Sequence, residues 1–248
     1  TVPEPARGQV EKKTSGPAQA VQLTGLRETF VHLWRTPSLR HVVIGSTLVS
    51  FIGYGGVAFG AAFLMRSHGL GLAQVGTILA PLGGLMGIIG ALSAGKLADK
   101  LALKDARWTA WIVAIAKTCA IPLALVFYLT DNLVIAFIAY APMVALSATY
   151  QASTFSMVQT LTPLKVRTQA SAILLFIINF IGLGGGPLTV GYLSDVLNPE
   201  YGVDSLRYAL LTVSMLGLWG AYHYYQAGRH YRDDLEKVGI LDKLPATA

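Results

Sequence analysis

The sequence predicts an all-α membrane protein in which six transmembrane helices form a 3+3 inverted repeat. Three observations lead to this fold class: the hydrophobic composition, the gathering of charges into short segments, and a five-residue pattern that occurs twice. Hydrophobic residues make up 53% of the 248 residues, charged residues make up 13%, and the mean hydropathy is +0.53. Because soluble domains carry about 25% charged residues, the composition excludes an ordinary soluble domain.

Six charge-poor runs are each long enough to cross a membrane. A helix needs roughly 20 apolar residues to cross a hydrocarbon core about 30 Å thick. Only helices and closed barrels satisfy the backbone in lipid, and these runs lack the alternation of barrel strands, so we predict helices. The runs cover residues 42–65, 72–95, 108–129, 133–164, 168–194 and 208–228, within a predicted six-helix bundle over residues 38–229.

The basic residues predict the orientation of these helices. Of the 19 Lys and Arg residues, all except Arg66, Lys117 and Arg207 lie before the first run, between the second and third, between the fourth and fifth, or after the sixth. The positive-inside rule places these segments and both termini in the cytoplasm. The net charge of +6 therefore indicates topology, and we expect membrane lipid but no nucleic acid as a partner.

The segments that flank the bundle are expected to be cytoplasmic or interfacial. Residues 1–24 are polar, contain Pro and Gly and lack an initial Met, so we predict a cytoplasmic linker inside a longer protein. Residues 25–37 predict an amphipathic helix in the membrane interface that ends before Pro37, and residues 230–248 predict a cytoplasmic tail. The apolar face of the interfacial helix is expected to consist of Leu26, Phe30, Leu33 and Trp34.

The repeated pattern closes the second and the fifth run. Gly95-Lys-Leu-Ala-Asp99 ends one, and Gly191-Tyr-Leu-Ser-Asp195 ends the other. Since three helices separate the two copies, Asp99 is expected on the cytoplasmic side and Asp195 on the opposite side. Inverted repeats of this kind are typical of secondary transporters. Both runs are also rich in glycine, which lets helix backbones approach closely, and we expect them to face a second six-helix half.

The end of the second run resembles the signature loop of the major facilitator superfamily. Gly95, Asp99 and Lys100 match the pattern Gly-x-x-x-Asp-[Arg/Lys], whereas the later glycine is absent and the following basic positions are reduced to Lys104 and Arg107. The resemblance implies half of a 12-helix major facilitator fold. It also implies a gating role for Asp99 and Lys100, in which the aspartate latches the cytoplasmic ends of neighbouring helices.

Further motifs resemble the spinster branch of that superfamily. They are Glu4-Pro5-Ala-Arg7-Gly8, Arg167 and the Gly186-Pro187 pair, at which the fifth helix is expected to bend. The resemblance implies that the chain is the C-terminal half of a transporter in a bacterial inner membrane and works with an N-terminal six-helix half. It implies proton-coupled or facilitated transport of a lipid-like or amphipathic small molecule, and gating roles for Arg167, Gly186 and Pro187.

Uncharged polar residues in the first and fourth runs are candidates for the substrate path, because these helices line it in the family. Uncharged polar groups in a bilayer need a partner or a water-filled cavity, so interhelical hydrogen bonds without substrate contact are the alternative. Asn179, in the fifth run, is expected to bond a neighbouring helix. The substrate-path candidates are Tyr54, Ser147, Tyr150, Gln151 and Thr154.

Lys117 is the one ionisable residue well inside a hydrophobic run. We include it among the substrate-path candidates, as a counter-ion for an acidic substrate or as part of a charge relay. The alternative is a structural hydrogen bond or partial snorkelling, since the third helix of a half is peripheral in the family.

No catalytic or metal-binding pattern is present in the sequence. The histidines lack a paired carboxylate or a second ligand at suitable spacing, and no phosphate-binding loop or nucleophile elbow occurs. We therefore expect no enzyme activity, no cofactor and no metal. The alternatives to a transporter half are a six-helix membrane enzyme or a channel subunit that acts without a second half.

Overall fold

The computed structural model describes residues 25–239, and within them all regular structure is helical. The predicted linker, with its Glu4–Gly8 motif, and residues 240–248 of the predicted tail lie outside the described residues. In chain order the helices are α2 (Leu26–Arg35), α3 (Pro37–His68), α4 (Leu72–Ala102), α5 (Trp108–Leu129), α6 (Leu133–Ser147), α7 (Tyr150–Leu161), η1 (Leu164–Val166), α8 (Arg167–Ile177), η2 (Ile178–Leu183), α9 (Gly184–Tyr201), η3 (Gly202–Asp204) and α10 (Ser205–Lys237).

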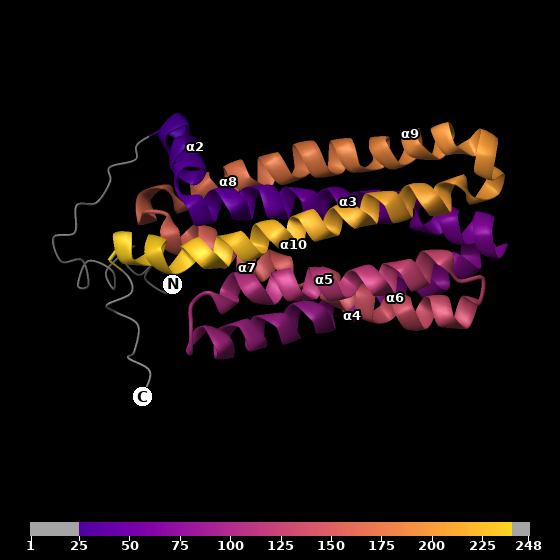
Figure 1. The fold of residues 1–248 in the computed structure, drawn as a ribbon, viewed down its shortest axis with the longest axis horizontal. Coiled ribbons are helices and arrows are strands. Elements are labelled where there is room, and N and C mark those ends of the chain that lie inside the picture. Colours follow the sequence, from indigo (N-terminus) through magenta and orange to yellow (C-terminus); the bar gives the residue numbers. More distant parts are fainter. Residues whose placement is uncertain (1–24, 240–248) are drawn as a thin grey trace, which may run out of the picture.

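By length and composition, five helical segments of the described chain are able to cross a membrane, which agrees with the predicted all-helical membrane fold. The fifth segment, Leu164–Lys237, has 74 residues, far more than the roughly 20 that one crossing needs. It reverses direction at the short turn η3, so that α9 and α10 lie side by side (Figure 1).

The long helices form an elongated bundle. In the view of Figure 1, α3 and α10 run between α8 and α9 on one side and α4, α5 and α6 on the other. α10 packs against α3, α5 and α9. The helix ends alternate between the two ends of the bundle, so that α4 ends at one end and α9 at the other (Figure 1). Asp99 and Asp195, close to those two helix ends, therefore lie toward opposite ends of the bundle.

The helix α2 lies across the end of the bundle, at a steep angle to the long helices (Figure 1). Thr29 and Leu33 are buried, and the Thr29 hydroxyl donates to Oε1 of Gln169 at 3.2 Å. Leu26, Phe30 and Trp34 are exposed. The predicted helix is present and ends at Arg35, before Pro37, but Leu33 packs into the bundle and does not share the exposed apolar face.

Two of the predicted continuous helices are interrupted. The fourth run divides into α6 and α7 at Ala148 and Thr149, where the Thr149 hydroxyl donates to the Leu146 carbonyl at 2.8 Å and competes with helical bonding. The fifth run contains the π-helical segment η2, immediately before α9. Pro187 has no N–H to donate to the Leu183 carbonyl and its ring crowds that carbonyl, which explains an irregular turn ahead of the proline.

Glycines permit close approach at two helix crossings. A Cβ at Gly186 would overlap the Phe51 carbonyl oxygen of α3, and one at Gly90 would overlap the Ala145 backbone of α6. Gly182 and Gly55 are also close to their neighbours across the α3 crossing. Other glycines of the same helices have nothing within 4 Å of an added Cβ; among them are Gly84, Gly87, Gly95 and Gly184. The glycine-rich runs therefore combine closely packed and open positions.

We predict that Gly186→Ala lowers the free energy of unfolding by about 1–3 kcal/mol, because the added methyl must displace the α3 backbone. Thermal or detergent-induced unfolding of the purified protein measures this change. Gly53→Ala, on α3, is the matched control, since its Cβ would meet nothing within 4 Å. Equal unfolding midpoints for the two variants would contradict the close α3–α9 contact.

Candidate functional site

Tyr54 and Asn179 form a polar contact between α3 and η2. The Tyr54 hydroxyl donates to Oδ1 of Asn179 at 2.8 Å, and Nδ2 of Asn179 donates to the Leu175 carbonyl at 2.8 Å. Tyr54 is half-buried and Asn179 is exposed. The expected interhelical role of Asn179 is thus present in the structure, and its partner is one of the predicted substrate-path residues.

The predicted polar residues of the fourth run have different surroundings. The hydroxyls of Tyr150 and Ser50 are 3.0 Å apart, which joins α7 to α3. Thr154 is fully buried and shares a hydrogen bond with the hydroxyl of Tyr224, which is also fully buried. Gln151 is exposed. The structure therefore places Thr154 in the packed core, while Gln151 is the candidate of this run that is available to a ligand.

Lys117 lies at the break between α6 and α7. Its Nζ donates to the Ser147 carbonyl at 2.9 Å and lies 5.3 Å from the centroid of the Tyr150 ring. The side chain is buried, with only 6% of the residue exposed. Lys117, Ser147 and Tyr150, three of the sequence-predicted site residues, are therefore in one contact group.

The predicted gating residues lie in two regions. Asp99 and Lys100 are exposed in the last turn of α4. Arg167, at the start of α8, donates through Nε to the Thr162 carbonyl at 3.1 Å and so braces the turn between α7 and α8. Gly186 and Pro187 lie in the first turn of α9, where Gly186 contacts α3.

Asp234 connects α3 and α10, the first and last long helices of the bundle, and no local sequence pattern points to it. Its carboxylate is 2% exposed and accepts from the backbone N–H of Ser38 at 3.0 Å and from the Ser38 hydroxyl at 2.7 Å. Nζ of Lys237 donates to the same carboxylate at 2.9 Å. Because Ser38 lies in the first turn of α3, Asp234 satisfies a helix N-terminus from a different helix.

Histidines that are distant in sequence meet between α3 and α10. Nδ1 of His41 and Nδ1 of His223 are 2.9 Å apart, and the His41 and His230 rings stack with centroids 5.9 Å apart. Spacing along the sequence does not predict this pairing. Within residues 25–239 the structure contains no group of three or more His, Cys, Asp or Glu residues arranged to hold a metal ion.

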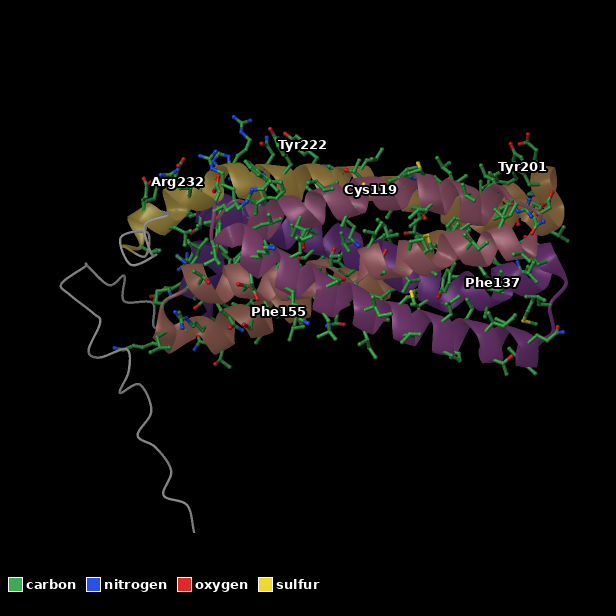
Figure 2. All side chains as sticks on the ribbon, turned by 90° about the horizontal axis from the view of Figure 1, so that it is seen from below. Cys119, Phe137, Phe155, Tyr201, Tyr222 and Arg232 are labelled. Carbon is green, nitrogen blue, oxygen red and sulfur yellow. The ribbon has the colours of Figure 1, made fainter. Side chains whose placement is uncertain are left out.

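The opposite end of the bundle carries a different polar contact. The Arg207 guanidinium donates to Asp131 at 2.9 Å and lies near Asp204. Figure 2 shows Tyr201 at this end, and Tyr222 and Arg232 on the outer surface toward the other end. The contacts of Arg207 and Asp234 join residues 76 and 196 positions apart, so no local sequence signal identifies them.

Comparison with known proteins relates the chain to membrane transporters. Residues 1–187 match the model of the Major Facilitator Superfamily. An "MFS-type efflux pump" of Mycolicibacterium smegmatis is 35% identical over 205 residues, which are 82% of this chain and 48% of the relative. The chain thus spans about half the length of this curated relative.

Solved structures of a bacterial homolog to the human lysosomal transporter Spinster share the fold. The inward-facing occupied form gives a TM-score of 0.70 at 23% identity, over 81% of this chain and 50% of that chain. The inward-facing unoccupied form gives a TM-score of 0.75 at 22% identity, over 89% of this chain and 53% of that chain.

We predict that Tyr224→Phe lowers the free energy of unfolding by about 0.5–2 kcal/mol, because it leaves the buried Thr154 hydroxyl without this partner. Tyr54→Phe removes a hydrogen bond at a more exposed position and is expected to cost less. Unfolding of both variants in the same detergent tests the difference. A larger loss in Tyr54→Phe would place the structurally important bond at the Tyr54–Asn179 contact instead.

Proposed function

This chain belongs to the major facilitator superfamily, and we propose that it forms the C-terminal half of a 12-helix transporter that works by alternating access. The observation that carries this proposal is the open surface of α4 and α9. Gly84, Gly87 and Gly95 of α4 and Gly184 of α9 have nothing within 4 Å of an added Cβ. Glycine has no side chain to contact lipid, so it contributes little stability on a lipid-facing surface, whereas it permits close packing against other helices. An N-terminal six-helix half is the partner that fits these positions.

Six membrane crossings in a 3+3 inverted arrangement are part of the proposal. The reversal at η3 supports two crossings within the fifth segment, one through α8, η2 and α9 and one through α10. The opposite positions of the ends of α4 and α9 support two triplets that run in opposite directions. With the basic residues on the cytoplasmic side, the ends of α4 and α10 face the cytoplasm of a bacterial inner membrane.

We further propose that the substrate is a small lipid-like or amphipathic molecule. The elements that carry Tyr54 and Asn179, and the adjoining α9, expose large apolar side chains, among them Val57 on α3, Phe180 on η2 and Leu188 on α9. A surface with few polar groups among apolar side chains suits a ligand with a polar head and an apolar tail. In the described residues the carboxylates lie close to helix ends, so we assign proton coupling to the N-terminal half.

Transport by the complete protein tests this function directly. In proteoliposomes, the complete protein is expected to move a fluorescent lysophospholipid, and this 248-residue chain alone is expected to move none. Transport by the chain alone would overturn the two-half proposal in favour of a channel subunit that acts without a second half. Breakdown of the lysophospholipid, followed by mass spectrometry, would favour the membrane enzyme.

We predict that Asp99→Asn slows uptake by the complete transporter by about tenfold, the effect of losing one hydrogen bond to a charged group, while folding is retained. Asp99 is exposed at the end of α4, where a latch partner from the N-terminal half has access. Asp195→Asn is the matched control, because this exposed residue holds the corresponding position of the second repeat. Unchanged uptake rates in Asp99→Asn would exclude the latch.

Labelling of single cysteines tests the inverted repeat. The exposed Cys119 is first replaced by Ser, and Asp99→Cys or Asp195→Cys is then introduced. A membrane-impermeant maleimide applied to intact cells is expected to label the cysteine at position 195. The cysteine at position 99 is expected to react only after the membrane has been permeabilised. Labelling of both from the same side would contradict the inverted arrangement.

A further inference from the structure

The interruption of the fourth membrane segment disturbs the regular helical bonding, because the Thr149 N–H bonds the Leu146 carbonyl, three residues back rather than four, at 3.4 Å. α6 ends at Ser147 and α7 begins at Tyr150, inside the segment Leu133–Leu161. A carbonyl released in a membrane interior has no water to bond and must find a donor in the protein. The Thr149 hydroxyl serves the Leu146 carbonyl, and the Lys117 ammonium serves the Ser147 carbonyl.

Lys117 contacts the chain on both sides of this interruption. Its ammonium bonds the last residue of α6 and lies over the ring of Tyr150, the first residue of α7. The C-terminus of a helix carries a partial negative charge, and the face of an aromatic ring attracts a cation. The carbonyl, the helix end and the ring together offset the cost of a buried charge at this depth.

Two further helices, α4 and α3, contact the residues on either side of the interruption. On α4, Gly90 lies so close to the Ala145 backbone that no side chain fits between them. On α3, the Ser50 hydroxyl is 3.0 Å from the hydroxyl of Tyr150. The start of α7 is thus fixed by α3 and α5, and the end of α6 by α4 and α5.

We propose that Lys117 is a positioning residue that holds together the two helix ends at the interruption between α6 and α7, rather than a counter-ion for the substrate. By bonding Ser147 and covering Tyr150, it sets the direction in which α7 leaves the break. Tyr150 and Gln151, the first two residues of α7, take their positions from this contact. The positioning of α7 by Lys117 does not depend on the transport proposal. The expected effect of Lys117 on transport kinetics rests on that proposal.

Hydrogen–deuterium exchange of the complete transporter tests the positioning of α7 by Lys117. In Lys117→Met, amides of residues 146–152 are expected to exchange at least about tenfold faster, because a hydrogen bond from a charged group is lost. Lys117→Arg keeps a donor and a charge and is expected to restore slow exchange. Thr118→Val, which removes a bond within α5 to the Ala114 carbonyl, is the matched control and is expected to leave these amides unchanged. Unchanged or slower exchange in Lys117→Met, or an equal effect of Thr118→Val, would overturn the proposal.

Transport kinetics separate positioning from substrate binding. With zwitterionic lysophosphatidylcholine and anionic lysophosphatidylglycerol as probes, Lys117→Met is expected to lower the maximal rate for both, with KM nearly constant. A KM raised for the anionic probe alone would assign Lys117 to the substrate and refute the proposal. The exchange experiment needs no substrate, so a failure of the transport proposal is distinguishable from a failure of this one.

Discussion

A buried backbone group has no water to bond, whether lipid or packed protein surrounds it, and this constraint explains the side-chain contacts at the helix ends and breaks. Lys117 serves the carbonyl at the end of α6, and Asp234 serves the N-terminus of α3. His32 lies 3.1 Å from the Leu161 carbonyl at the end of α7, and Arg167 serves Thr162 just beyond it. Each is a polar side chain from another segment or the next turn. These four polar residues therefore complete the backbone bonding of the fold.

Hydrophobic length and charge position were enough to predict the helical membrane fold, because both follow directly from the thickness of the bilayer. The same runs could not reveal the interruptions at Thr149 and at η2, since a few apolar residues around a break leave the composition of a segment unchanged. Local competition by a threonine hydroxyl and crowding by Pro187 decide these positions. Glycine content predicted close packing, but the neighbouring helix decides which glycines are in contact and which are open.

The sequence predicts which residues of the candidate site are polar and need hydrogen-bond partners. It does not predict which residues those partners are. Tyr54, Tyr150 and Thr154 were identified as polar groups that need partners, and each has one. Burial, which depends on the tertiary packing of α7 against α3 and its other neighbours, separates Thr154 from the exposed Gln151. The contacts of Asp234 with Ser38 and of His41 with His223 join the two ends of the chain, and spacing along the sequence carries no information about such pairs.

The length of α10 has a mechanical consequence. Its 33 residues extend about 50 Å at 1.5 Å per residue, well beyond the hydrocarbon core. Tyr231 and Leu235, near its C-terminal end, remain buried in the same cluster as Leu33 of α2. One helix thus reaches from the depth of the lipid to the cluster at the end of the bundle that also holds α2. Because both segments contribute side chains to one packed core, a shift of α2 would disturb the packing around the C-terminal end of α10.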